Sequence, residues 1–138
     1  MNLEPFLQKK ILVVDDMASI RDALIAILRR LGFVDIHQAV DGKMGWLKVQ
    51  ENALYEPFDI IFSDVMMPNC NGIEFLQLVR SHAAHQKTPI LMVTAENEKD
   101  TIFGAIEAGA SSYILKPFNV KIIEQKLFEI LSKQAAQK

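Results

Sequence analysis

Five polar side chains that could take part in chemistry each stand at the end of a short apolar run. The runs are rich in aliphatic and β-branched residues, are too short to cross a membrane, and suit buried strands of a parallel sheet. Because the carboxyl ends of parallel strands share one edge, where ligands bind in open α/β sheets, we expect the five side chains to meet there. They are Asp15, Asp16, Asp64, Thr94 and Lys116.

Each of these residues taken singly has an ordinary explanation. An aspartate after a strand is typical of a turn or of a helix N-terminus, and a lone threonine or lysine is typically a turn hydroxyl or a solvated charge. The joint pattern favours a common site, because the polar residues follow four separate apolar runs.

Three carboxylates that share one crevice indicate a divalent cation. Like charges so close raise one another's pKa, and Mg²⁺ relieves the repulsion because it prefers oxygen ligands and is typically held by carboxylates and a phosphate. The Thr94 hydroxyl and the Lys116 ammonium suit a phosphoryl group. We therefore predict that Asp64 is a nucleophile that forms an aspartyl-phosphate, and that Asp16, with Asp15 behind it, holds Mg²⁺.

The elements that must position these side chains alternate between strand and helix patterns, which predicts an α/β fold with a parallel sheet. With right-handed crossovers, the leading topology is a doubly wound (βα)5 sheet of flavodoxin-like order, 2-1-3-4-5. The strands are expected at 11–14, 33–40, 58–62, 89–93 and 113–115, and the helices at 19–31, 43–52, 73–79, 99–108 and 120–131.

Several details of the helices follow from the same patterns. Ser19 is expected to cap the first helix and Gly32 to end it. In the second helix, Met44 and Leu47, with Trp46, are expected to point inward. We expect a leader without clear pattern at 1–8, one domain at 9–133 and a frayed tail at 134–138.

Bulk composition narrows the class of protein. A chain of 138 residues is long enough for one domain with a proper core. Its net charge of −2 argues against general nucleic-acid binding. A single cysteine, Cys70, excludes an internal disulfide and a cysteine-based zinc cluster. With no signal-like or membrane-spanning run, we expect a cytoplasmic protein that does not associate with membranes.

Five segments together resemble the receiver domains of two-component response regulators, most of all the single-domain chemotaxis (CheY-like) regulators. The resemblance runs from about Lys10 to Leu131. The segments are Leu12-Val13-Val14-Asp15-Asp16, Asp64 with Met67-Pro68-Asn69 and Gly72, Val93-Thr94-Ala95-Glu96, Ala108-Gly109-Ala110-Ser111, and Tyr113-Ile114-Leu115-Lys116-Pro117-Phe118.

The resemblance implies a set of roles. Asp64 would accept phosphate from a histidine kinase or a histidine phosphotransfer protein, and the chain would act as a monomeric signalling protein that catalyses only its own phosphorylation and dephosphorylation. Asp16 and Asp64 would bind Mg²⁺ with the carbonyl of Met66, and Asp15 would act through water. Thr94 and Tyr113 would be the switch pair, and the Lys116–Pro117 bond would be cis. A downstream protein would bind a face that includes Lys99, Ile102, Ile106, Tyr113 and Leu115.

The sequence also departs from its relatives. Position 66 is Met where chemotaxis relatives often carry Asn, and this position together with Glu96 tunes phosphate lifetime in the family. Val65 stands where some relatives have Trp, and the segment Val49–Pro57 is a few residues longer than in compact relatives.

Other functions stay open at this point. The chain could be a phosphorelay intermediate, a phosphate sink, or the receiver portion of a longer regulator. A phosphatase of the haloacid dehalogenase class needs an Asp two positions after the nucleophile, where Met66 stands. A flavodoxin needs a phosphate loop rich in small residues after the first strand, where Asp15 and Asp16 stand. A metal at His82 and His85 lacks a third ligand, and Phe103 could belong to the partner face or to the core.

Overall fold

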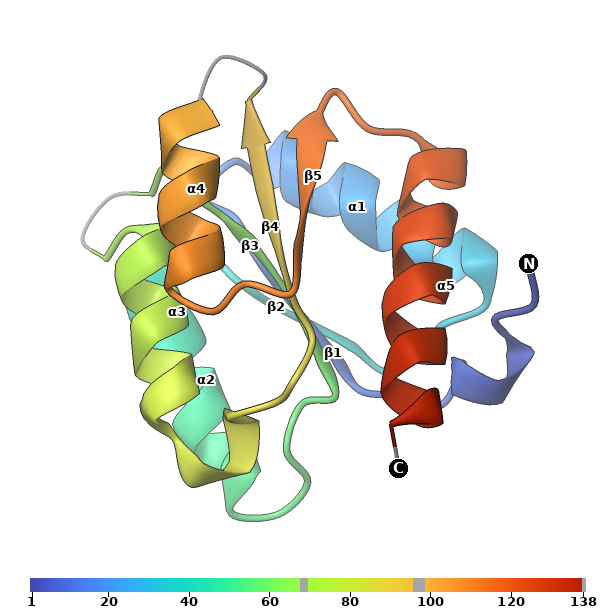
Figure 1. The fold of residues 1–138 in the computed structure, drawn as a ribbon, viewed down its shortest axis with the longest axis horizontal. Helices are drawn as coiled ribbons and strands as arrows, with labels where there is room; N and C mark the ends of the chain where they lie inside the picture. Colours follow the sequence, from blue (N-terminus) through green and yellow to red (C-terminus); the bar gives the residue numbers. More distant parts are fainter. Residues whose placement is uncertain (68–69, 96–98, 138) are drawn as a thin grey trace.

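A five-stranded parallel sheet forms the centre of the computed structural model, which describes residues 1–67, 70–95 and 99–137. The strand order is β2-β1-β3-β4-β5, which confirms the predicted doubly wound topology (Figure 1). The strands are β1 (Ile11–Val14), β2 (Ile36–Ala39), β3 (Ile60–Asp64), β4 (Ile90–Ala95) and β5 (Ser112–Lys116). The helices are α1 (Ala18–Leu31), α2 (Gly42–Ala53), α3 (Gly72–Ser81), α4 (Lys99–Glu107) and α5 (Val120–Ala136), with short 3-10 turns η1 (Glu4–Phe6) and η2 (Ala83–His85).

Helices cover both faces of the sheet and create two apolar cores. Helices α1 and α5 pack on one face, and α2, α3 and α4 pack on the other (Figure 1). The three central strands are buried along their length, except at Ala95, the last residue of β4. This explains why their sequences are continuous apolar runs instead of alternating patterns.

The strand register brings the polar strand ends together. Val14 pairs with Ser63 and Asp64 pairs with Val93, so Asp15 follows β1 beside the last residue of β3. Thr94 pairs with Leu115, one residue before Lys116. The carboxylates, the hydroxyl and the lysine therefore share one edge of the sheet.

Helix α3 begins in direct contact with the end of β3. Its N-terminus carries a capping box, in which the Asn71 side chain accepts from the Glu74 N–H and the Glu74 carboxylate accepts from the Asn71 N–H. The Gly72 N–H donates to the Val65 carbonyl over 2.8 Å. A Cβ at Gly72 would lie 2.2 Å from the Asp64 carbonyl oxygen, so only glycine allows this approach.

Two helix predictions were wrong for local reasons. Ser19 lies inside α1, whose N-cap is Met17, although Gly32 ends the helix in the left-handed conformation as expected. In α2, Met44 and Leu47 are exposed, and the buried positions are Gly42, Gly45 and Val49. Trp46, also expected to point inward, is half-buried and packs against the core. Glycines carry no apolar signal, yet they let α2 approach its neighbours closely: a Cβ at Gly45 would lie 3.0 Å from the Phe75 ring of α3 and 3.1 Å from Val14 Cγ2 of β1.

The ends of the chain are more ordered than the sequence indicated. The leader contains the turn η1, and Leu3 is buried in the core between the sheet, α1 and α5. Helix α5 continues to Ala136, so residues 134–136 are helical in this structure. Strand β2 is shorter than predicted, because it begins only at Ile36.

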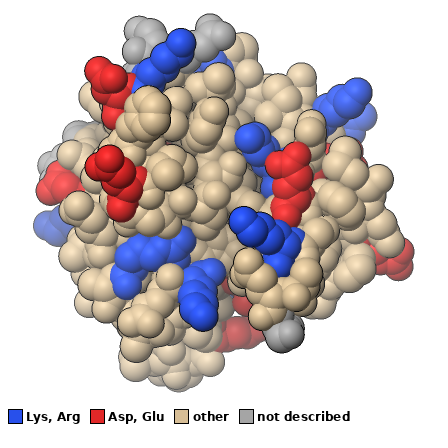
Figure 2. All heavy atoms as spheres, viewed as in Figure 1, with Lys and Arg blue, Asp and Glu red and all other residues tan. Residues whose placement is uncertain are grey.

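The remaining general features agree with the predictions made from the sequence. The Lys116–Pro117 bond is cis. No helix in the described ranges is long and apolar enough to cross a membrane. On the face seen in Figure 2, Lys and Arg side chains are interspersed with Asp and Glu, as the small net charge of −2 indicates.

Candidate functional site

Three carboxylates gather at the carboxyl edge of the sheet. Asp15 and Asp64 are buried, whereas Asp16 is exposed. One carboxylate oxygen from each lies within 4.8 Å of the others. The loop after β1 and the end of β3 position them, because β1 and β3 are paired neighbours in the sheet.

Lys116 joins this cluster from the end of β5. Its Nζ lies 3.2 Å from Asp64 Oδ1 and 3.8 Å from Asp15 Oδ2. One ammonium therefore faces two buried carboxylates, with a third carboxylate at the surface. The site carries an excess of negative charge that a cation would neutralise.

Burial changes the proton affinity of both buried acids. Desolvation and the neighbouring Asp15 raise the pKa of Asp64 from 3.8 to about 6, while Lys116 acts in the opposite direction. Desolvation likewise raises the pKa of Asp15, opposed chiefly by the backbone N–H of Met17. At neutral pH Asp64 remains mainly ionised, so it is available as a nucleophile.

The backbone after β1 fixes the orientation of Asp15. The Met17 N–H donates to Asp15 Oδ1 over 2.9 Å, and Arg21 Nη1 donates to the Asp15 carbonyl over 2.8 Å. Arg21 Nε also donates to Gln38 Oε1 over 2.8 Å. Sequence reasoning missed these supporting groups.

The other predicted site residues lie around the same edge. Thr94 is fully buried near the end of β4. The Met66 side chain is 61% exposed, between the buried side chains of Val65 and Met67. Pro68 and Asn69, from the motif after Asp64, and Glu96, expected to tune phosphate lifetime, lie outside the described residues.

The donor set fits a magnesium ion. All three side chains are carboxylates, the donors that Mg²⁺ prefers, and the exposed Asp16 leaves one side of the cluster open to the waters and phosphate oxygen that such an ion would retain. Asp15, Asp16 and Asp64 could hold the ion.

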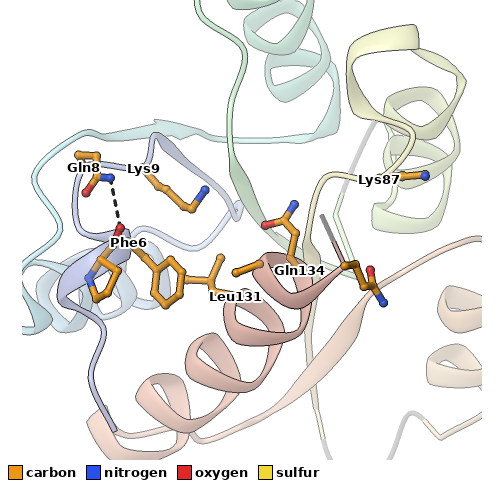
Figure 3. A pocket seen from close by; sticks show the side chains of 9 residues that line it. Phe6, Gln8, Lys9, Lys87, Leu131 and Gln134 are labelled. Carbon is orange, nitrogen blue, oxygen red and sulfur yellow. Dashed lines mark hydrogen bonds between the residues drawn. The ribbon is translucent and has the colours of Figure 1, made fainter.

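A separate hollow at the opposite edge of the sheet takes no part in this arrangement. It has a volume of about 490 Å³ and lies between the η1 segment and the end of α5 (Figure 3). Phe6, Lys9, Leu131 and Gln134 line it, and Gln8 Nε2 beside them donates to the Pro5 carbonyl over 3.2 Å. It shares no residue with the carboxylate cluster.

Comparison with known proteins identifies the family. The family model for the response regulator receiver domain matches residues 11–128. The chain belongs to the receiver domain family. It is 35% identical over 122 residues to chemotaxis protein CheY1 of Helicobacter pylori, covering 88% of this chain and 96% of that protein.

Further relatives support the same family assignment. The chain is 35% identical to a chemotaxis protein CheY homolog of Campylobacter jejuni, again over 88% of this chain and 92% of the relative. Among solved structures, chemotaxis protein CheY4 of Vibrio cholerae aligns with a TM-score of 0.80 and 34% identity, over 89% of this chain and 98% of the other. A receiver domain is a phosphorylation-activated signalling switch of two-component systems, and neither the phosphatase nor the flavodoxin alternative is favoured. Receiver domains bind Mg²⁺ at an acidic cluster of the kind seen here.

The predicted partner face of this receiver domain forms one groove. A hollow of about 430 Å³ lies over α4 and β5, and all five residues expected on the face line it. Phe103 lines it too and is 72% exposed, so this residue belongs to the face and not to the core. Tyr113 is half-buried in the groove, with Lys126 Nζ lying 5.2 Å from the centre of its ring. The lining residues are Lys99, Ile102, Phe103, Ile106, Tyr113 and Leu115.

Proposed function

We propose that Asp64 accepts a phosphoryl group from a phosphohistidine on a histidine kinase or a histidine phosphotransfer protein. The observation that supports this most is the buried Asp64 carboxylate at the end of β3, with Lys116 Nζ at 3.2 Å and two further carboxylates beside it. Asp16 is exposed, so the cluster is open to a donor on one side.

The transfer needs little beyond positioning and charge. An Asp64 oxygen forms a bond to phosphorus, the phosphorus–nitrogen bond of the donor breaks, and the imidazole leaves with the electron pair of that bond. Lys116 and the Thr94 hydroxyl contact the transferred group. Asp16, Asp64 and the Met66 carbonyl would hold Mg²⁺, with Asp15 acting through water, and the bound ion would supply positive charge to the phosphoryl oxygens.

The output is a change of the face formed by α4, β5 and α5. After phosphorylation Thr94 moves toward the phosphate and Tyr113 turns inward, and the groove over α4 and β5 then binds a downstream protein. The groove is open and mainly apolar, which suits a protein segment. We place this receiver domain in a chemotaxis pathway, because its relatives at 35% identity carry that name.

A role as a phosphorelay intermediate or phosphate sink would use the same chemistry with a different partner. We propose further that the protein is cytoplasmic and monomeric and contacts neither nucleic acid nor membrane. The net charge of −2 supports the absence of general nucleic-acid binding, which usually requires a basic face.

The chemistry is tested by incubating the protein with Mg²⁺ and acetyl phosphate and measuring the intact mass. We expect one phosphoryl group per chain on the wild type and none on Asp64→Asn. Asp22→Asn, an exposed carboxylate on α1, is the matched control and should be labelled like the wild type. An unmodified wild type, or equal labelling of Asp64→Asn, would refute the assignment.

The output is tested by capture of a partner. The phosphorylated wild type should retain a protein that Asp64→Asn does not retain. Thr94→Ala should accept phosphate yet retain that protein poorly, because the hydroxyl that moves toward the phosphate is missing. Equal retention by Thr94→Ala would contradict the switch.

A further inference from the structure

Arg80, in the last turn of α3, connects three separate parts of the chain. Its guanidinium donates from Nε to the Gly109 carbonyl over 2.9 Å, from Nη1 to the His85 carbonyl over 2.8 Å and from Nη2 to Ser111 Oγ over 3.3 Å. The acceptors lie in η2 and in the connection between α4 and β5. All three nitrogens of the guanidinium are therefore engaged.

The partners of Arg80 are unusual for a half-buried cation. Among the described residues, no carboxylate lies within ion-pair distance of it. Burial lowers the pKa of the Arg80 guanidinium, yet arginine stays protonated at neutral pH. The desolvation of this charge is offset by hydrogen bonds to neutral oxygens, which hold the backbone of the α4–β5 connection in place.

The oxygen that Arg80 Nε contacts lies directly after the end of α4. Gly109 has a φ of 110°, the left-handed conformation that closes a helix. Its N–H donates to the Ile106 carbonyl, and the Ala110 N–H donates to the Ala105 carbonyl. A positive charge at the C-terminal end of a helix is also favoured by the helix dipole. Arg80 thus contacts the backbone that closes α4, two residues after the helix ends at Glu107.

The next contact extends this anchor to the sheet. Ser111 Oγ accepts from the Ile90 N–H over 3.0 Å, and the Ser111 N–H donates to the Ile90 carbonyl over 2.8 Å. Ile90 is the first residue of β4, whose other end carries Thr94. The C-terminal end of α4 is therefore tied to α3 and to the start of β4 together.

The two halves of α4 differ in burial. Within α4 only Ala105, in the second half, is buried, and Lys99 and Asp100 are exposed. The half of α4 that follows β4 therefore has no fully buried side chain and lies away from the contacts of Arg80.

We propose that Arg80 is a positioning residue that fixes the C-terminal end of α4, so that phosphorylation moves the N-terminal half of α4 about this anchor. The inference rests on the proposed output through α4, β5 and α5. The inference adds a fixed point, Arg80, to the face formed by α4, β5 and α5, on the side away from the carboxylates.

Hydrogen–deuterium exchange of the whole chain tests the anchor before any phosphorylation. In Arg80→Met, we expect the amides of residues 105–111 to exchange about tenfold faster, equivalent to about 1.4 kcal/mol, while β1 and β3 keep their wild-type rates. Arg80→Lys should restore only part of the protection, because one ammonium cannot reach three acceptors in fixed directions. Arg30→Met, an exposed arginine on α1, is the matched control and should leave these amides unchanged.

The same measurement with Mg²⁺ and acetyl phosphate tests the pivot. Within α4 and the connection that follows it, the change on phosphorylation of the wild type should be confined to residues 99–104, and in Arg80→Met it should extend through 105–111. A uniform acceleration over the whole chain in Arg80→Met would show a merely structural role and overturn the proposal, as would equal changes in both halves of wild-type α4.

Failure of the proposed phosphorylation can be distinguished from failure of the Arg80 anchor. It would appear as a missing phosphoryl group in the intact mass, and the exchange of the unmodified variants would then support or overturn the anchor by itself.

Discussion

Replacing Asp64 by Asn should make the protein more stable at neutral pH, although it removes the proposed phosphoacceptor. Asp64 is 5% exposed and its pKa rises from 3.8 to about 6, chiefly because burial penalises the charged form. A raised pKa means that the folded state binds a proton more tightly than the unfolded state. Ionisation of Asp64 therefore opposes folding, and the wild type loses stability as the pH rises from 3.8 through 6.

The size of the effect follows from the same values. At about 1.36 kcal/mol for each tenfold change in proton affinity, full ionisation of Asp64 opposes folding by an upper limit of about 3 kcal/mol. Asn has nearly the same shape and carries no charge, so Asp64→Asn should recover most of this at pH 7. The advantage should shrink to about 1.5 kcal/mol at pH 5 and about 0.5 kcal/mol at pH 4, where the wild-type carboxyl is protonated in the folded state.

The assay is urea unfolding followed by circular dichroism at pH 4, 5, 6 and 7, with a chelator present. Subtracting the wild-type free energy of unfolding from that of Asp64→Asn at each pH removes the contributions of groups that titrate alike in both. Asp22→Asn, on the exposed face of α1, is the control and should change the free energy little at any pH.

Two results would refute this reasoning. The first is an Asp64→Asn protein that is less stable than the wild type at pH 7. The second is a gain that does not depend on pH, which would show that the carboxylate is solvated and that Lys116, at 3.2 Å, balances it fully.

Three further outcomes follow from individual contacts. Lys10→Met should lower the free energy of unfolding by about 2 kcal/mol in urea titrations, because the buried Lys10 ammonium donates to Asn52 Oδ1 over 2.7 Å and ties the end of α2 to β1; an unchanged value would show that this contact contributes nothing. Gly72→Ala should reduce phosphorylation from acetyl phosphate and lower the melting temperature, since its Cβ would lie 2.2 Å from the Asp64 carbonyl oxygen, and wild-type behaviour would contradict the close approach. Burial lowers the pKa of His85 from 6.5, so the fold should lose stability as the pH falls from 6.5 through the lower folded value; His85→Gln should lose less over that range, and an identical pH profile would exclude His85 as the cause.

The sequence by itself determined the architecture and most of the chemistry. Buried parallel strands must be continuous apolar runs, so β1, β3 and β4 could be located from composition alone. The polar residue that ends each run then lies at the shared carboxyl edge, because all the strands point the same way. Asp15, Asp64 and Lys116 could therefore be placed together without coordinates.

Local patterns failed where the relevant property was not hydrophobicity. The inward face of α2 is formed by Gly42, Gly45 and Val49, and glycine contributes close approach instead of apolar area. The periodicity of Met44 and Leu47 therefore indicated the wrong face. The sequence of the leader also gave no indication of its packing. Only the structure shows that Leu3, within the leader, is part of the core.

Only the tertiary structure decided which polar groups support the site and its output face. Arg80 reaches Gly109, 29 residues along the chain, and Lys10 reaches Asn52, 42 residues along. Sequence periodicity reports which face of one element is buried, because it reflects burial over a few neighbouring residues. A hydrogen bond between distant elements depends on how whole helices pack against the sheet. The carboxylates at the strand ends were therefore predictable, whereas the guanidinium that holds the end of α4 was visible only in the folded chain.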